Sequence, residues 1–227
     1  MGDVNQLLFV KSVAHALKGP VLEVGSRDYG NTQNFRALFP GADYVGIDMQ
    51  AGKGVDLVLD LTDDFASLDA SLGGRRFGTI ICMSVLEHCR NPFRMAQNIE
   101  ALLAEGGNLV IGAPFVWELH GFPDDYWRFT PSGIRVLFPN LDFSAVPGAA
   151  FTGRKGDTAP LDGNLFCIRL SSKNPETRRL LGAMSANLIG LFRKAGWMKK
   201  LLGHRSVFPS VMVSMVGRKT APAKGGD

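Results

Sequence analysis

The first 114 residues alternate between strand and helix patterns, and this alternation restricts the possible folds more than any other feature of the chain. The apolar runs at 79–83 and 108–113 have no polar face, which is typical of buried strands, and the segment 92–103 between them has the spacing of a helix that begins at a proline. Strands and helices that alternate in this way form βαβ units, in which the strands are parallel. We therefore predict an α/β fold with a mostly parallel sheet and helices on both faces.

The same patterns assign the remaining elements. Strands are predicted at 21–24, 44–47, 55–59, 79–83, 108–113, 143–146 and 207–216, and helices at 5–17, 31–39, 65–72, 92–103 and 134–138. The predicted sheet therefore has seven strands. We predict a single domain over residues 1–219, with a basic helical insertion at about 173–205 before the last strand and a disordered polar tail at 220–227.

Charge is concentrated in the predicted insertion. The chain has 25 Lys and Arg residues against 21 Asp and Glu, and residues 173–205 alone contain eight basic side chains and one acidic side chain. The rest of the chain is therefore mildly acidic. Two interpretations of the helical part, 177–202, stay open. It is either a lid or homodimer contact whose charges are solvated, or a basic amphipathic helix in peripheral contact with an anionic membrane.

Cysteine usage and the absence of targeting signals favour the cytoplasm. The three cysteines are odd in number, and Cys82 falls inside a predicted buried strand, which favours reduced thiols. The first residues lack the basic and apolar regions of an export signal, and no apolar stretch approaches the roughly 18 residues of a membrane span. We expect a cytoplasmic protein, with peripheral membrane contact as the alternative.

The turn after the first predicted strand gives the first indication of a ligand. This strand ends with the acidic Glu23 and the glycine turn at Gly25, and Asp48 ends the next strand. Open α/β sheets bind ligands at the carboxyl ends of their strands, where helix N-termini and backbone N–H groups are available. A carboxylate at the spacing of Asp48 accepts hydrogen bonds from ribose hydroxyls. The pair predicts a nucleoside ligand.

Three further segments complete a known pattern. They are Val-Asp-Leu-Val-Leu-Asp-Leu at 55–61, the run 77–88 that ends in Leu-Glu-His, and the run 102–114 that contains Gly-Gly. In this order, over about residues 20–140, they resemble the class I S-adenosylmethionine-dependent methyltransferases, in the branch with a Leu-Glu-His signature. The resemblance implies a Rossmann-like fold with S-adenosyl-L-methionine as cofactor. It also implies that the cofactor is bound by Glu23, Gly25, Ser26, Asp48, Met49, Asp60, Leu61 and Ser84.

The chain departs from the family pattern at two places. Arg27 and Tyr29 stand where the family has alternating glycines, so that the next glycine is Gly30, and Gly78 stands where an Asp is common. The first departure predicts a wider turn, and the second is expected to be structural. The spacing from Gly25 to Gly30 also lacks the Gly-x-Gly-x-x-Gly of NAD-binding proteins, which makes NAD the weaker alternative.

An aromatic-rich segment after the fifth predicted strand is expected to bind the methyl acceptor. Polar and aromatic groups beside a cofactor are what an acceptor pocket needs, and hydroxyl acceptors gain from a general base, most often His. Residues 120–131 are also similar to a segment of bacterial methyltransferases associated with polysaccharide assembly. We therefore predict a hydroxyl of a sugar, glycan or other small molecule as the acceptor. The predicted bases are His120 and, alternatively, His88, and the predicted acceptor-binding residues are Trp117, Tyr126 and Arg128.

Other functions are alternatives or are disfavoured. The alternatives are a natural-product or quinone-like acceptor, and a non-catalytic Rossmann-like binding protein that has lost its cofactor. A nucleic acid partner is disfavoured, because residues 84–87 differ from the Asp/Asn-Pro-Pro-aromatic turn of enzymes that methylate base amines and the basic segment has few aromatic residues. No His, Asp or Glu cluster stands at metal-ligand spacing, so no metal is expected.

Overall fold

The computed structural model describes residues 4–30, 32–121, 123–153, 158–161, 168–169, 206–207 and 210–220. The chain divides into two compact units, Met1–Asp162 with Ser210–Asp227 and Gly163–Pro209. In the second unit, β9 (Ile168–Arg169) and β10 (Ser206–Val207) form an antiparallel pair. The predicted basic insertion at 173–205, its helix at 177–202 and nearly all of the predicted tail lie outside the described residues. These predictions, and that of a single domain, stay open.

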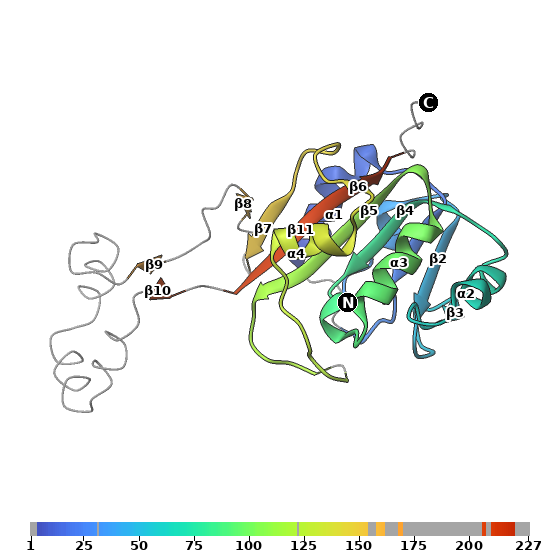
Figure 1. Cartoon of the computed structure of the whole chain (residues 1–227), viewed down its shortest axis with the longest axis horizontal. Helices are drawn as coiled ribbons and strands as arrows, with labels where there is room; N and C mark the ends of the chain where they lie inside the picture. Colours follow the sequence, from blue (N-terminus) through green and yellow to red (C-terminus); the bar gives the residue numbers. More distant parts are fainter. Residues whose placement is uncertain are drawn as a thin grey trace, which may run out of the picture. The chain divides into compact units, whose positions relative to one another are not determined.

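One large sheet organises the first unit (Figure 1). Its strands lie in the order β3-β2-β1-β4-β5-β11-β7-β8, and β6 pairs with β11 outside this path. Pairing is parallel from β3 to β5 and antiparallel beyond β5. The predicted α/β Rossmann-like fold is confirmed, with nine strands in place of seven. The strands are β1 (Val21–Val24), β2 (Tyr44–Asp48), β3 (Leu57–Val58), β4 (Phe77–Met83), β5 (Leu103–Val116), β6 (Leu141–Asp142), β7 (Ala150–Gly153), β8 (Thr158–Pro160) and β11 (Val211–Lys219).

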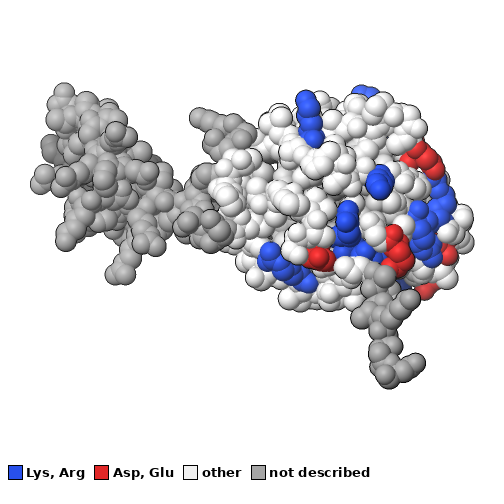
Figure 2. All heavy atoms as spheres, turned by 90° about the horizontal axis from the view of Figure 1, so that it is seen from above, with Lys and Arg blue, Asp and Glu red and all other residues white. Residues whose placement is uncertain are grey.

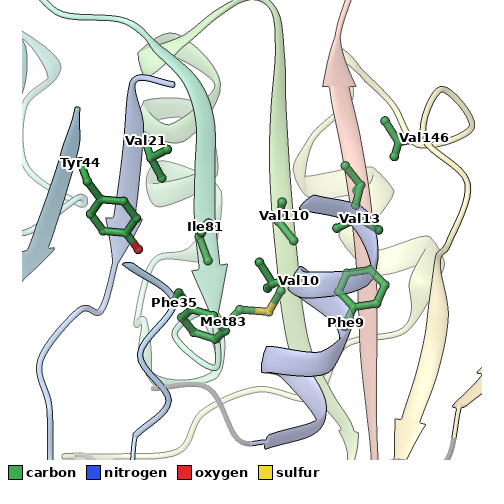
Figure 3. Close-up of a cluster of buried hydrophobic side chains, with 11 residues drawn as sticks. Phe9, Val10, Val13, Val21, Phe35, Tyr44, Ile81, Met83, Val110 and Val146 are labelled. Carbon is green, nitrogen blue, oxygen red and sulfur yellow. The ribbon is translucent and has the colours of Figure 1, made fainter. Parts of the chain in front are cut away.

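Helices cover both faces of this sheet. α1 (Val4–Val13) and α3 (Pro92–Leu102) lie on opposite faces (Figures 1 and 3). Asn91 caps the start of α3 by accepting a hydrogen bond from the Arg94 N–H group, as a polar residue before a helical proline is expected to do. The other helical elements are α2 (Phe65–Ser71), α4 (Pro131–Leu137) and the 3₁₀ turns η1 (Ala14–Ala16), η2 (Arg36–Leu38) and η3 (Leu86–His88).

The hydrophobic core under α1 shows how the strands are buried (Figure 3). Ile81 and Met83 of β4 face α1, whereas Ile80 and Cys82, which are also inaccessible to solvent, alternate with them and point to the other face. The central sheet is thus buried on both sides, which explains why its strands read as continuous apolar runs. The cluster consists of Phe9, Val10, Val13, Val21, Phe35, Tyr44, Ile81, Met83, Val110, Val146 and Val216.

The helix predicted at 31–39 is wrong. Of its described residues, only Arg36–Leu38 are helical, and they form the single 3₁₀ turn η2. Asp28 Oδ1 accepts hydrogen bonds from the Gly30 N–H group and the Thr32 hydroxyl, both at 2.8 Å. A side chain that captures local donors in this way favours a turn over a helix start.

The strand predicted at 143–146 is also wrong. Asp142 Oδ1 accepts from the Ser144 N–H group at 2.8 Å and from its hydroxyl at 2.6 Å, and this turn ends β6. The chain pairs with β11 again only in β7. Val146 is buried because it packs in the core under α1 and not because it lies in a strand. The strand predicted at 55–59 is shorter than expected and is limited to β3.

The described surface carries mixed charge. Basic and acidic side chains lie next to each other on the face shown in Figure 2. Ion pairs such as Arg76–Asp69 join half-exposed groups. No helix in the part of the chain that the structure describes is long and apolar enough to span a membrane. Cys82 and Cys89 are buried free thiols, and Cys82 lies in β4 as predicted.

Candidate active site

A cavity of about 500 Å³ opens at the carboxyl ends of β1, β2 and β4. The strand order reverses between β1 and β4, and such a switch point is where open α/β sheets bind ligands. The walls come from the ends of these strands, from residues 59–62, 84–85 and 88–91, and from Pro123, Asp124 and Tyr126. The cavity therefore lies between the sheet edge and the aromatic-rich segment, and its volume is typical of a small-ligand site.

Six of the eight predicted cofactor residues line this cavity: Gly25, Asp48, Met49, Asp60, Leu61 and Ser84. Glu23 and Ser26 are not among its lining residues. Glu23 Oε2 accepts a hydrogen bond from the Tyr44 hydroxyl at 2.6 Å, and burial raises the pKa of this carboxyl. The Ser26 hydroxyl is buried against β2, where a Cβ added at Gly46 would lie 2.7 Å from it. Both residues therefore lie against β2, where they support the turn and do not face the cavity.

The turn after β1 is closed by side chains where the family pattern has glycines. Gly25 adopts a φ of +74°, and the N–H groups of Gly25 and Ser26 donate to the Ile47 carbonyl at 2.9 and 3.0 Å. Arg27 is hydrogen-bonded to Gln50 and lies over the Tyr29 ring, with 4.9 Å between its Cζ and the ring centroid. Tyr29 of this turn and Gln50, which follows β2, both line the cavity, so side chains form this part of its wall.

Gly78, the second departure from the family pattern, has a structural cause. A Cβ at this position would lie 2.7 Å from the Gly19 carbonyl oxygen and 2.8 Å from that of Lys18. Both contacts are with backbone atoms that cannot rotate away. The start of β4 therefore leaves no space for the Asp that is common in the family.

Two carboxylates stand on the wall formed by β2 and residues 59–62. Asp48 Oδ1 accepts from the Gln50 N–H group at 2.9 Å, and Asp60 Oδ1 accepts from both the N–H group and the hydroxyl of Thr62 at 2.8 Å. Buried Asn98 of α3 fixes the following residues, because its amide donates to the Leu61 carbonyl at 2.7 Å and to that of Asp63 at 3.0 Å. This wall is thus held from inside the fold.

Ser84, at the end of β4, is held in a rare backbone conformation. Its φ is +54°, which is uncommon for a residue with a side chain and is found mainly where surrounding structure imposes it. The Gln6 amide donates to its hydroxyl at 3.0 Å, and its N–H group donates to the Gly112 carbonyl at 2.9 Å. Gln6 is fully buried in α1, so the first helix helps to shape the cavity.

A polar group of three residues forms the outer wall. The Tyr126 hydroxyl donates to Asp124 Oδ2 at 2.6 Å and accepts from Arg90 Nε at 2.7 Å, and the Arg90 and Asp124 side chains are 3.8 Å apart. All three residues line the cavity and are exposed to solvent. The predicted acceptor residue Tyr126 therefore lies where expected, together with two partners that the sequence analysis did not single out.

The two candidate bases lie one behind the other. His88 lines the cavity, whereas His120 does not and packs edge-on against His88, with 5.0 Å between the ring centroids. His88 Nδ1 is 2.6 Å from the Asp124 carbonyl oxygen, and its Nε2 is buried near Glu87. Burial lowers the pKa of His88 and raises the pKa of Glu87 to about 7. The geometry thus does not favour His120 as a base that touches an acceptor.

Arg128 and Trp117 were predicted to bind the acceptor, but neither lines the cavity. The Arg128 guanidinium forms a bidentate ion pair with the buried Asp125 carboxylate at 2.5 and 2.7 Å, and it lowers the pKa of that carboxyl to about 2. The same guanidinium donates to the Glu118 carbonyl at 3.1 Å. Arg128 therefore organises the loop from within, and its charge is already neutralised by Asp125.

Several residues of the site escaped the sequence analysis. Asn98 interrupts the apolar face of α3, a signal that could have identified it as a buried hydrogen-bonding residue. Gln6 gives the same signal, because it is a polar residue on the buried face of α1. No pattern in the sequence indicates the pairing of Arg90 and Asp124, because the two residues lie in loops that are far apart along the chain.

The chemistry of the cavity fits S-adenosylmethionine. Asp48 and Asp60 provide acceptors for the hydroxyl and amino donors of a nucleoside, and Ile47, Leu59 and Met95 provide apolar surface for a base. The side chain of Ser84 is small and therefore leaves space in the cavity at the end of β4. The cavity thus contains acidic, apolar and small groups of the kind that the resemblance assigns to the cofactor.

Comparisons with known proteins agree with this fold. A solved S-adenosylmethionine-dependent methyltransferase from Archaeoglobus fulgidus has 13% identity and a TM-score of 0.50, over 95% of this chain and 94% of that chain. The 1,6-didemethyltoxoflavin-N1-methyltransferase of Burkholderia thailandensis has 13% identity and a TM-score of 0.52, over 96% and 80%. The N-terminal domain of EvdMO1, crystallised in the presence of SAH and D-fucose, has 14% identity and a TM-score of 0.50, over 96% and 84%.

At these identities the solved structures show the fold, and the sequence itself shows the family. No curated protein matches the chain. A family model described as a methyltransferase domain matches residues 5–139, which are more than half of the chain and contain every residue that lines the cavity. The chain belongs to this methyltransferase domain family and is an S-adenosylmethionine-dependent methyltransferase.

Proposed function

We propose that this enzyme methylates a hydroxyl group of a sugar, a glycan or another small molecule. The observation that carries the proposal is the convergence of Arg90, Asp124 and Tyr126 at the outer wall of the cavity. A carboxylate accepts hydrogen bonds from hydroxyls, and a guanidinium donates to hydroxyl and ring oxygens. The Tyr126 ring adds an apolar surface for the C–H groups of such a molecule.

The opposite wall is proposed to hold the cofactor, which supplies an electrophilic methyl group on its sulfonium. Asp48 would accept from the ribose hydroxyls, and Asp60 and the Leu61 N–H group would recognise the adenine. Ser84 also lines the cavity, and its small side chain would leave space for the sulfonium. The residues of the chain would thus accelerate the reaction mainly by orientation, since an in-line displacement requires the acceptor oxygen to be held against the methyl carbon.

Asp124 is the proposed partner of the reacting hydroxyl. Its carboxylate already accepts from the Tyr126 hydroxyl, so it is oriented and able to accept another hydrogen bond. Of the two predicted histidine bases, His88 is the one at the cavity, but its Nε2 is buried and its Nδ1 is directed at a backbone carbonyl. A direct role in proton removal is therefore assigned to Asp124 before His88.

The first acceptors to test are sugars. The EvdMO1 domain, which has the same fold, was crystallised in the presence of SAH and D-fucose. The test is transfer of labelled methyl groups from S-adenosylmethionine to monosaccharides and nucleotide sugars, with phenols, quinols and amines in parallel and products identified by mass spectrometry. Products labelled only on phenols, quinols or amines would contradict the sugar or glycan hydroxyl and favour the natural-product or quinone-like alternative.

Two variants separate cofactor binding from acceptor binding. Asp48→Ala should abolish the rise in melting temperature that S-adenosylhomocysteine produces, because the ligand stabilises only a fold that binds it. Asp124→Asn should keep this rise and lower turnover at least tenfold, whereas Asp142→Asn, a carboxylate outside the cavity, should change neither. No rise with the unaltered chain would favour a non-catalytic protein that has lost its cofactor.

A further inference from the structure

Glu87, His88 and His120 form a cluster that neither the cofactor wall nor the proposed acceptor wall uses. Each side chain offers one ligand-type atom, and these atoms lie within 4.8 Å of one another. Glu87 is 1% exposed, and the side chain of His88 is 8% exposed. The cluster joins two distant segments, because Glu87 and His88 belong to η3 and His120 belongs to the loop after β5.

The neighbours of the two imidazoles determine which nitrogen carries the proton. His88 Nδ1 is 2.6 Å from the Asp124 carbonyl oxygen, and His120 Nδ1 is 3.1 Å from both the Glu118 carbonyl oxygen and Asp125 Oδ2. Carbonyl and carboxylate oxygens can only accept, so in the neutral ring each Nδ1 carries the proton and each Nε2 has the lone pair that a metal ion needs. Metal-binding histidines are oriented in the same way, through a hydrogen bond from the nitrogen that does not bind the metal.

The buried acceptor atoms in this cluster have no partner. His88 Nε2 and Glu87 Oε2 are inaccessible and accept no hydrogen bond from any described residue. Glu87 Oε1 lies 3.9 Å from His88 Nε2, which is too far for a hydrogen bond between them. A buried polar atom without a partner is costly, and a cation bound by Glu87 and His88 would give both side chains a partner.

We propose that Glu87, His88 and His120 bind one divalent transition-metal ion. Two imidazoles and a carboxylate suit Zn²⁺ and related ions, whereas Ca²⁺ and Mg²⁺ prefer all-oxygen sites. In a tetrahedral zinc site the ligand atoms are about 3.4 Å apart, so the cluster would have to contract by about 1 Å. His120 lies on a partly exposed loop that can make this adjustment. The bound ion would tie this loop to η3 beside the cavity.

The sequence analysis predicted no metal, because its search was for ligands at short spacing along the chain. The fold supplies what the spacing lacks. The hydrogen bond from the Tyr126 N–H group to the Glu87 carbonyl, 2.8 Å long, holds the loop of His120 against η3. The cluster is therefore a product of the tertiary structure.

The test measures metal binding and not activity. The full chain is stripped with a chelator, dialysed against a low concentration of Zn²⁺ and then against buffer, and its metal content is measured by inductively coupled plasma mass spectrometry. We expect about one ion per chain for the unaltered protein and a fall to background for Glu87→Gln and His120→Asn. His15→Asn, which removes a histidine of η1 outside the cluster, is the matched control and should retain the ion.

Two further measurements keep the result unambiguous. Circular dichroism and the shift produced by S-adenosylhomocysteine establish that each variant is folded. Absorption of the Co²⁺-loaded protein should show d–d bands without a thiolate charge-transfer band, which distinguishes this site from binding at cysteines. Absence of bound metal in the unaltered protein, or equal metal content in the unaltered protein and both cluster variants, would overturn the proposal.

Discussion

Replacement of Asn98 by Ala tests whether the cofactor wall is held from inside the fold. Asn98 is 2% exposed, and its amide donates to the Leu61 and Asp63 carbonyls at 2.7 and 3.0 Å. Both carbonyls belong to the segment that follows Asp60 at the cavity wall. The truncation removes both donors and leaves the rest of α3 unchanged, so the effect can be assigned to these two hydrogen bonds.

The expected loss of stability follows from the number of bonds. Each hydrogen bond contributes about 0.5–1.5 kcal/mol net, so the pair is worth about 1–3 kcal/mol. Alanine is a better helix former than asparagine by up to about 0.7 kcal/mol, which offsets part of the loss. We expect a net destabilisation of about 1.5 kcal/mol, which lowers the melting temperature of a chain of this length by about 3–6 °C.

The assay combines urea denaturation with calorimetric titration of S-adenosylhomocysteine. If part of the cost of ordering the wall passes to the binding step, the affinity of the variant should fall by up to about tenfold, since 1.4 kcal/mol corresponds to a factor of ten. Gln97→Ala is the control, because Gln97 is the exposed neighbour in the same helix and should stay within about 0.5 kcal/mol of the unaltered chain. If Asn98→Ala behaved like Gln97→Ala in both measurements, Asn98 would not be an anchor of the wall.

Two other perturbations test the strands that support the cavity. Gly78→Ala should destabilise the fold by about 1–3 kcal/mol, because its Cβ would clash with the Lys18 and Gly19 carbonyls. The control is Gly133→Ala, whose Cβ would meet only a hydroxyl at 3.3 Å; in urea denaturation its free energy of unfolding should be nearly unchanged. An unchanged free energy of unfolding for Gly78→Ala would mean that the backbone at the start of β4 can shift to accept the added Cβ. Glu23→Gln tests an effect of pH on stability. Burial raises the pKa of Glu23 in the folded chain above its value in the unfolded chain. The contribution of Glu23 to the free energy of unfolding is therefore complete below the unfolded pKa and is lost as the pH rises through the folded pKa. The free energy of unfolding of the unaltered chain should therefore fall relative to that of Glu23→Gln as the pH rises above the ordinary carboxyl pKa, and parallel curves would contradict this account.

The sequence predicts those parts of the fold whose physical cause is local or periodic. The sequence predicts β4 and β5 because strands buried on both faces have no polar side, and it predicts α3 because Pro92 marks its start. The helix at 31–39 and the strand at 143–146 failed because a single aspartate side chain redirects the backbone in each case. Such hydrogen bonds depend on a few atoms and leave no periodic pattern.

The candidate site divides in the same way. Asp48 could be placed because it ends a strand of a parallel sheet, and Asp60 was assigned from the resemblance to the family; both line the cavity. The predicted acceptor residues His120, Trp117 and Arg128 were chosen from the composition of the segment and from its resemblance to other methyltransferases. Neither can distinguish a side chain that faces a cavity from one that holds a loop. Arg128 is the clearest example, because its partner Asp125 lies next to Asp124, which does face the cavity.

The two walls of the cavity are fixed by different interactions, and this difference bears on how the enzyme selects its acceptor. The cofactor wall rests on strand ends and on buried amides such as Asn98. The proposed acceptor wall belongs to a loop that the Asp125–Arg128 ion pair organises. Two hydrogen bonds hold this loop against η3 and Cys89: the Tyr126 N–H group donates to the Glu87 carbonyl, and the Trp127 indole donates to the Cys89 carbonyl. Under the proposed function, substitutions at the loop residues that face the cavity should change the acceptor without disturbing the sheet. Loss of the Arg128 guanidinium should loosen the whole loop, since it would leave the buried Asp125 carboxylate without its ion-pair partner.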